Sequence, residues 1–116
     1  MLSKEAILSA VDRNRVLIDV PEWGGSVWVA AISAAEKDAF DAENFVKRGE
    51  RYEPRLDNVK ARFLVRCLED DDRKPLFGLH DAAALGAKSA AVIDRLYEVA
   101  ARLNKVDATQ EESAKN

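Results

Sequence analysis

The sequence predicts an α+β domain that is predominantly α-helical, with four to five helices and one N-terminal β-hairpin. Apolar residues recur at helical spacing in several segments, most clearly in residues 89–103. Two runs rich in β-branched residues, 16–20 and 26–32, flank a loop with proline and glycine, which is typical of paired strands. We therefore expect residues 1–104 to form a single α-rich domain with the hairpin at about 16–32, and residues 105–116 to form a flexible polar tail.

Size and composition are those of one globular domain. The chain has 116 residues, of which 47% are hydrophobic and 34% charged, a balance that excludes a wholly disordered chain. No apolar run approaches the roughly 20 residues that cross a bilayer, and the N-terminus lacks the pattern of a secretory signal. The single cysteine, Cys67, cannot form an intramolecular disulfide. These features predict a cytoplasmic protein that does not contact a membrane.

The first two helices are predicted from their N-terminal caps. Ser3 is a good N-cap for a helix that continues to about Val11. A Ser-x-x-Glu capping box at residues 33–36 begins a second helix, which we expect to end near Lys47. Residues 49–54 then form a polar connection. The expected apolar stripe of the second helix consists of Ala35, Ala39, Ala42 and Val46.

Three more helices are predicted in the second half of the chain. Asp57 can cap a third helix that continues to Leu68. A short helix over residues 78–85 is expected to stop at Gly86, and Ser89 can cap the last helix. Apolar residues at helical spacing form the expected buried faces of the third and last helices: Val59, Phe63, Leu64, Cys67 and Leu68, then Val92, Ile93, Leu96, Val99, Ala100 and Leu103.

The loop of the β-hairpin and the strand after it carry the candidate interaction residues. A lone two-stranded hairpin is marginally stable in water, so it must pack on helices or pair its open edge with another subunit. We favour that edge for self-association. Tryptophan is enriched at binding hot spots. Trp23 is nevertheless expected mainly to anchor the loop or pack in the core. For Trp28, both a core role and an intersubunit role are open. The candidate protein-interaction residues are Trp23, Gly24, Gly25, Trp28 and Val29.

The residue types that support catalysis or metal binding are present only in isolation. Cys67 shares an apolar stripe with Phe63, which predicts an inert core thiol. His80 is the one histidine and is expected to be solvated near the start of a helix. The acidic run 70–72 lacks the ligand spacing of a calcium loop, and Gly24-Gly25 is not followed by the Lys-Ser/Thr of a phosphate loop. We therefore expect no enzymatic activity, no metal and no cofactor.

Several segments form a recognisable pattern in their order along the chain, and together they cover nearly all of it. These segments are Val20–Gly25, Ser33–Phe40, the aspartate-rich turn before Leu76-Phe77, Ala84–Ser89, Asp94–Ala100 and Arg102–Asn104. The pattern resembles the tail assembly chaperones of siphovirus-type phages and prophages. The sequence departs from the family pattern in three places: Arg73 follows Asp72 in a turn where the family often has a glycine, residues 78–80 are less acidic, and Trp28 and Ala30 stand where more polar residues are expected.

The resemblance implies a chaperone that acts in the host bacterial cytoplasm. Members of such a family are expected to bind the long tape measure protein before the tail tube polymerises around it. They are also expected to form homo-oligomers and to be absent from the mature virion. Many are made in two forms, of which the longer arises by a programmed ribosomal frameshift near the end of the short reading frame.

The last three residues are compatible with such a frameshift. Ala114-Lys115-Asn116 can be encoded as GCA-AAA-AAC, which contains the slippery sequence A-AAA-AAC. Both ribosome-bound tRNAs can pair with this sequence again after they slip back by one base. Because the genetic code is degenerate, the protein sequence is equally compatible with other codons, and the final codons of the gene decide between them.

Two other functions are alternatives to a chaperone. The first is a structural virion component, such as a tail completion protein, which would be present in purified particles. The second is a small helical DNA-binding regulator, whose best candidate recognition helix is 58–68 with Lys60, Arg62 and Arg66. The net charge of −3 and the scattering of basic residues among acids disfavour binding to nucleic acid.

Overall fold

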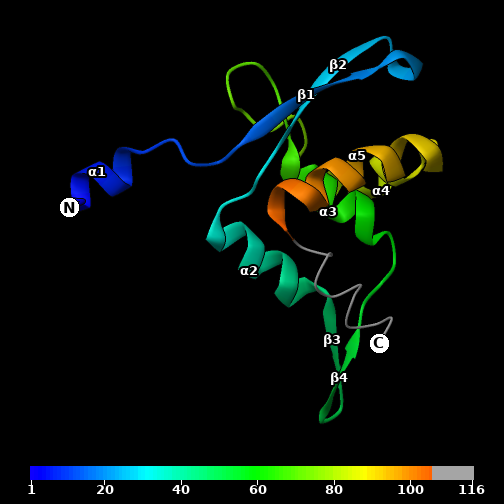
Figure 1. Ribbon diagram of the computed structural model, residues 1–116. Coiled ribbons are helices and arrows are strands. Elements are labelled where there is room, and N and C mark those ends of the chain that lie inside the picture. Colours follow the sequence, from blue (N-terminus) through cyan, green and yellow to red (C-terminus); the bar gives the residue numbers. More distant parts are fainter. Residues whose placement is uncertain (106–116) are drawn as a thin grey trace, which may run out of the picture.

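The computed structural model describes residues 1–105, which form five α-helices, two 3-10 turns and five β-strands (Figure 1). This arrangement confirms the predicted α+β class with an N-terminal hairpin. Residues 106–116, which the sequence assigns to the polar tail, lie outside the described residues. In chain order the elements are α1 (Lys4–Ser9), β1 (Arg15–Val20), η1 (Pro21–Trp23), β2 (Gly25–Ala30), α2 (Ala34–Glu43), β3 (Phe45–Arg48), β4 (Arg51–Pro54), α3 (Val59–Cys67), β5 (Leu68–Glu69), η2 (Leu79–Asp81), α4 (Ala82–Gly86) and α5 (Ala90–Asn104).

The N-terminal hairpin belongs to a three-stranded antiparallel sheet of order β1-β2-β5. β1 and β2 pair along their full length, from Val20 opposite Gly25 to Arg15 opposite Ala30. β5 pairs with the other edge of β2, where Leu68 lies opposite Val29. The sequence places Leu68 in the third helix, because its apolar side chain continues the helical spacing. Within the described residues, the outer edge of β1 has no partner strand.

Helix α3 lies at the centre of the core. Six of its nine residues are buried, because the sheet, α4 and α5 all pack around it. The ring of Phe63 contacts Phe40 from α2 at a centroid distance of 4.8 Å and Tyr97 from α5 at 5.9 Å. The largest fully buried side chains are Phe63, Leu64, Leu68, Leu96, Val20, Val29, Val92 and Cys67.

A second hairpin replaces the end of the predicted second helix. Helix α2 ends at Glu43 rather than near Lys47, and Phe45–Arg48 pairs with Arg51–Pro54 as β3 and β4. Gly49 has φ of 64° at the first position of the two-residue turn, where glycine adopts this conformation without steric cost. The prediction of a polar connection over 49–54 is therefore wrong. The predicted stripe of Ala35, Ala39, Ala42 and Val46 is exposed, and Phe40 is the buried residue of α2.

Caps explain where several helices begin. The hydroxyl of Ser3 accepts a hydrogen bond from the Ala6 amide at 3.1 Å, and Ser33 accepts one from Glu36 at 3.2 Å, so both predicted caps are confirmed. Asp57 does not cap the third helix. The residue before α3 is Asn58, with φ of 49°, whose side chain donates to the carbonyl of Ala82 at 2.8 Å.

Two boundaries differ from the predictions for local reasons. Helix α1 ends at Ser9 rather than Val11, and none of its residues is buried. Helix α4 ends at Gly86 as predicted, but neither Gly86 nor the next residue, Ala87, has a positive φ, so the helix does not stop at a left-handed residue. A Cβ atom on Gly86 would overlap the side chain of Asn58. The glycine therefore permits α4 to approach the start of α3 closely.

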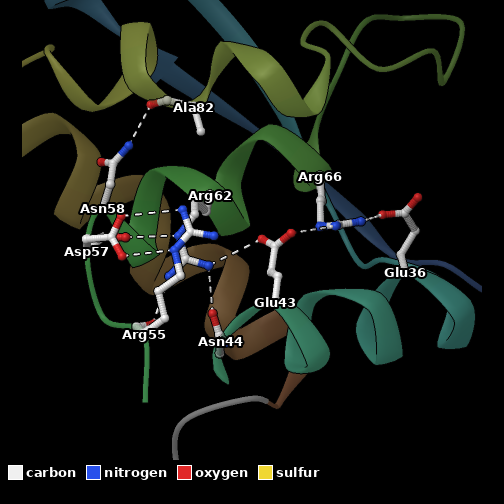
Figure 2. Close-up of polar contacts among 9 residues, drawn as sticks. All are labelled: Glu36, Glu43, Asn44, Arg55, Asp57, Asn58, Arg62, Arg66 and Ala82. Carbon is white, nitrogen blue, oxygen red and sulfur yellow. Dashed lines mark hydrogen bonds and ion pairs between the residues drawn. The ribbon is translucent and has the colours of Figure 1, made fainter. Parts of the chain in front are cut away.

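The buried guanidinium of Arg62 holds the base of the second hairpin (Figure 2). Its Nε donates to the Asp57 carbonyl at 2.9 Å, and its Nη2 donates to the Arg55 carbonyl at 3.0 Å. Its Nη1 donates to Asn44 Oδ1 at 2.8 Å and to Glu43 Oε1 at 3.3 Å. These partners lie at both ends of the β3–β4 segment. One side chain on α3 therefore fixes where this segment leaves the core and where it returns.

Removal of this side chain tests its role. We expect Arg62→Ala to lower the free energy of unfolding by about 3 kcal/mol, because two carbonyls and a carboxylate lose their buried donor. Amide hydrogen exchange in residues 45–54 should accelerate more than exchange in α5.

Arg48→Ala is the matched control in the same hairpin. Arg48 forms an exposed ion pair with Glu53 at 2.9 Å, so its removal should change stability by less than about 1 kcal/mol. Chemical denaturation measures both variants. Equal losses for the two arginines would contradict the role assigned to Arg62.

Candidate protein-interaction surfaces

The loop of the N-terminal hairpin presents Trp23 at the surface. Trp23 ends η1 with 37% of its area exposed, and Gly24 follows with φ of 79°, a conformation that glycine favours. Glu22 binds Arg95 of α5 through both carboxylate oxygens, at 2.9 and 3.0 Å. The hydrogen bond from Arg95 lowers the pKa of Glu22 to about 2. This ion pair fixes the loop against α5 while leaving part of the indole accessible.

Trp28 lies on the outer face of the sheet. It pairs with Leu17 across the ladder, so the two side chains share one face, and Leu17 is 49% exposed. The Arg15 guanidinium lies 3.9 Å from the centroid of the Trp28 ring, and the indole Nε1 donates to Asp71 Oδ1 at 2.7 Å. Val29 points to the opposite face and is fully buried, so its side chain packs in the core and does not reach the surface.

The acidic turn 70–74 holds Trp28 in place. Arg15 donates to the carbonyls of Asp70 and Asp71 at 3.0 and 3.3 Å, and Asp70 Oδ1 accepts the amide hydrogens of Asp72 and Lys74. The sequence shows this run only as a solvated turn. Its partners Arg15 and Trp28 lie more than forty residues away in the chain, so no local pattern indicates them.

A groove of about 430 Å³ lies between α3, the acidic turn and the start of α2. We call it the polar groove. Within the described residues, two buried side-chain atoms have no hydrogen-bond partner, Arg66 Nε and Glu69 Oε1, and both residues line this groove. One atom is a donor and the other an acceptor, which matches the amide groups of a peptide. Its apolar walls include Ile32, Val65, Pro75, Phe77 and Leu79.

A second groove, which we call the apolar groove, has a volume of about 320 Å³. It lies beside the free edge of β1, with Val16 and Ile18 on one wall and residues from the end of α5 on the other. Among its lining residues, Arg102 is the charged one. The sequence contains the apolar residues of both walls, but it does not show that the two walls meet at the surface. The complete lining is Val16, Ile18, Val99, Arg102 and Leu103.

Comparison with known proteins identifies the family. The model of the phage tail assembly chaperone family matches residues 3–116. The chain belongs to this family. The solved tail assembly chaperone of bacteriophage HK97 has the same fold, with a TM-score of 0.59 and 18% sequence identity over 85% of this chain and 90% of that chain. No curated protein matches the sequence.

Membership in this family means that the protein is a non-enzymatic chaperone. Burial raises the pKa of the Cys67 thiol to about 12, so the nucleophilic thiolate is scarce at neutral pH. The side chain of His80 is 87% exposed, as the sequence predicts. Within residues 1–105, no group of three or more His, Cys, Asp or Glu is arranged to hold a metal ion, and no helix is long and apolar enough to cross a bilayer.

The chaperone does not use α3 as a DNA-recognition helix. The side chains of Arg62 and Arg66 are only 6% and 4% exposed, and Arg66 binds Glu36 and Glu43 of α2 (Figure 2). Lys60 pairs with Asp94 at 2.7 Å. Since Arg62 and Arg66 are buried and bind residues of the same chain, they are not available for phosphates or base edges, and the partly exposed Lys60 alone is too little charge for a nucleic-acid surface. This finding removes the basis for the DNA-binding alternative.

The Glu22–Arg95 ion pair makes a small contribution to stability that depends on pH. The pKa of Glu22 is lowered from 4.5 to about 2 in the folded chain. The contribution is therefore complete above the unfolded pKa and is lost as the pH falls through the folded value. We expect Glu22→Gln to melt at a lower temperature than the unmodified protein at pH 7, and the difference to narrow towards pH 2.

Thermal unfolding followed by circular dichroism across this pH range measures the effect. Glu98→Gln, on the exposed side of α5, is the matched control and should melt like the unmodified protein at neutral pH. A pH-independent difference for Glu22→Gln would contradict the assigned ion pair.

Proposed function

We propose that this chaperone binds the tape measure protein of its phage and keeps it soluble in the host cytoplasm until the tail tube assembles. The observation that carries the proposal is the family match over residues 3–116. Since a tape measure protein spans the length of a tail, it is expected to be long and helical with apolar stripes. Such stripes aggregate unless another surface covers them.

The surfaces of the chain suit a client of this kind. An amphipathic helix binds by placing apolar side chains in a groove, and tryptophan residues often anchor such contacts. Trp23 and Trp28 offer two such anchors, with Gly24 and Gly25 shaping the loop between them and Val29 supporting the strand from the core. The polar groove adds one unpaired donor and one unpaired acceptor for amide groups of the client.

Self-association is part of the proposed function. A long client presents many similar segments, so an oligomer with repeated weak sites gains avidity without tight binding at any one site. The free edge of β1 supports association, because its unpaired backbone groups can pair with another chain. The chaperone is then released and is absent from the mature virion.

Co-expression with the tape measure protein tests the chaperone role. We expect the tape measure protein to remain in the soluble fraction only when the chaperone is present, and Trp23→Ala to reduce the soluble amount several-fold. Phe45→Ala, in the exposed β3–β4 hairpin, is the matched control and should retain full effect. Equal solubility of the tape measure protein with and without the chaperone would overturn the proposal. Detection of the chain in purified particles would favour a structural virion component instead.

We also propose that the gene directs a longer, frameshifted form of the chain. Ala114-Lys115-Asn116 permits the slippery codons GCA-AAA-AAC, and these residues lie outside the described part of the structure. We expect the gene to use GCA-AAA-AAC for these three residues and to have an overlapping reading frame at this point. Sequencing of these three codons checks the prediction, and any other codons at these positions contradict it.

A further inference from the structure

Helix α1 is separated from the rest of the molecule. In Figure 1 it lies at the end of an extended segment, away from the sheet and the other helices. None of its residues is buried, although it carries Ile7 at 56% exposure and Leu8 at 75%. Leu2 and Val11, on either side of it, are 73% and 78% exposed. We call residues 1–12 the arm.

A helix of this kind requires a packing surface. Six residues are too few for a stable isolated helix in water, even with the Ser3 cap, because nucleation is costly. Four large exposed apolar side chains within 11 residues also form a patch of the kind that marks a binding site. The arm therefore requires a complementary groove, and it carries the apolar residues that can bind in one.

The described residues of the same chain form a groove of matching character. Four of the five residues lining the apolar groove are aliphatic, and it adjoins the free edge of β1. Val16 in its wall is 40% exposed. We propose that the arm of one copy docks in the apolar groove of a second copy. This proposal rests on the self-association included in the proposed function, and it names the surfaces that form the contact.

Charge at the two surfaces is complementary. Glu5 is exposed on α1, one turn before Leu8, and Arg102 is the charged residue at the groove. Within the described residues, neither side chain has a hydrogen bond or an ion pair. With the apolar side of α1 in the groove, Glu5 lies at its rim, where Arg102 can bind it. Docking also favours extension of the helix to Val11, because Ile7 and Val11 then share the buried side.

The attachment of the arm favours a second copy over its own chain. Arg13 is fixed to the body, since its Nη1 donates to the Ala31 carbonyl at 2.9 Å and to Glu69 at 3.1 Å. Its carbonyl accepts from Arg73 at 3.0 Å, and the Asn14 carbonyl accepts from Ala31 at 2.8 Å. Only residues 10–12 are free to bend, and they span about 10 Å at most. Docking within one chain would require a complete reversal over these three residues.

Two copies that exchange arms with each other form a closed dimer. Where each copy instead gives its arm to one neighbour and receives the arm of another, the contact is heterologous and repeats from copy to copy until a ring closes. A repeated array of this kind supplies the repeated client sites that the proposed function requires.

Sedimentation velocity over a wide range of concentrations tests the contact with the full-length chain. We expect Leu8→Asp to weaken self-association about tenfold or more, the loss expected when one leucine no longer enters an apolar site. Leu56→Asp, at a similarly exposed leucine outside the arm, is the matched control and should associate like the unmodified protein. Both variants should keep the circular dichroism spectrum and melting temperature of the unmodified protein.

A charge exchange tests the pairing of arm and groove. Glu5→Arg alone and Arg102→Glu alone should each weaken association several-fold, because each places like charges together. The double variant should recover most of the loss, since it restores an opposite pair in reversed order. Failure of the double variant to recover, with both single variants weakened, would overturn this pairing.

A mixing experiment gives the decisive result. Leu8→Asp has a defective arm and an intact groove, whereas Val16→Lys has a defective groove and an intact arm. Each should be mainly monomeric alone, and an equimolar mixture should form heterodimers. Only monomers in the mixture would overturn the inference. It would also be overturned if the Leu8→Asp variant associated as strongly as the unmodified protein; self-association would then stand, and only the role of the arm would fail. If the unmodified protein were monomeric at every concentration, self-association would be removed from the proposed function as well.

Discussion

Arg62 and Arg66 lie on the helix that fills the centre of the core, so their guanidinium groups must find partners where water has little access. Those partners are carboxylates at both ends of α2, and an amide and carbonyls at the base of the second hairpin. If the helix at this position were entirely apolar, it would hold its neighbours by packing alone, and packing alone allows neighbouring elements to shift along one another. Directional hydrogen bonds from two rigid planar groups instead fix α2 and the hairpin in one orientation.

Local signals account for most of the fold that the sequence predicts. The caps at Ser3 and Ser33, the strands around Pro21 and the long apolar stripe of α5 each depend on neighbours within a few residues. The failures have a different origin. Phe45 and Val46 continue a helical pattern, and the turn at Gly49 becomes decisive only once β4 pairs beside them. Leu68 likewise becomes a strand residue because β2 lies next to it.

The interaction surfaces were less predictable than the fold. The sequence suggests Trp23 and Trp28 as candidates from residue type and loop chemistry, and in the structure 37% of the Trp23 surface is exposed. It does not indicate that Arg15 and Asp71 bracket the Trp28 ring, because that arrangement joins residues far apart in the chain. The two grooves have the same limitation. Each forms where separate elements meet, and its lining residues individually resemble ordinary core or surface positions.

The second hairpin has a further consequence for how such chains diverge. Its base is fixed by hydrogen bonds from the body, while its tip at Gly49 and Glu50 contacts solvent. Selection for stability therefore acts on the base and on the positive φ of Gly49, and it leaves the exposed side chain of Glu50 nearly unconstrained. Relatives can lengthen, shorten or recharge this projection during coevolution with their partners, and the domain beneath it keeps its architecture.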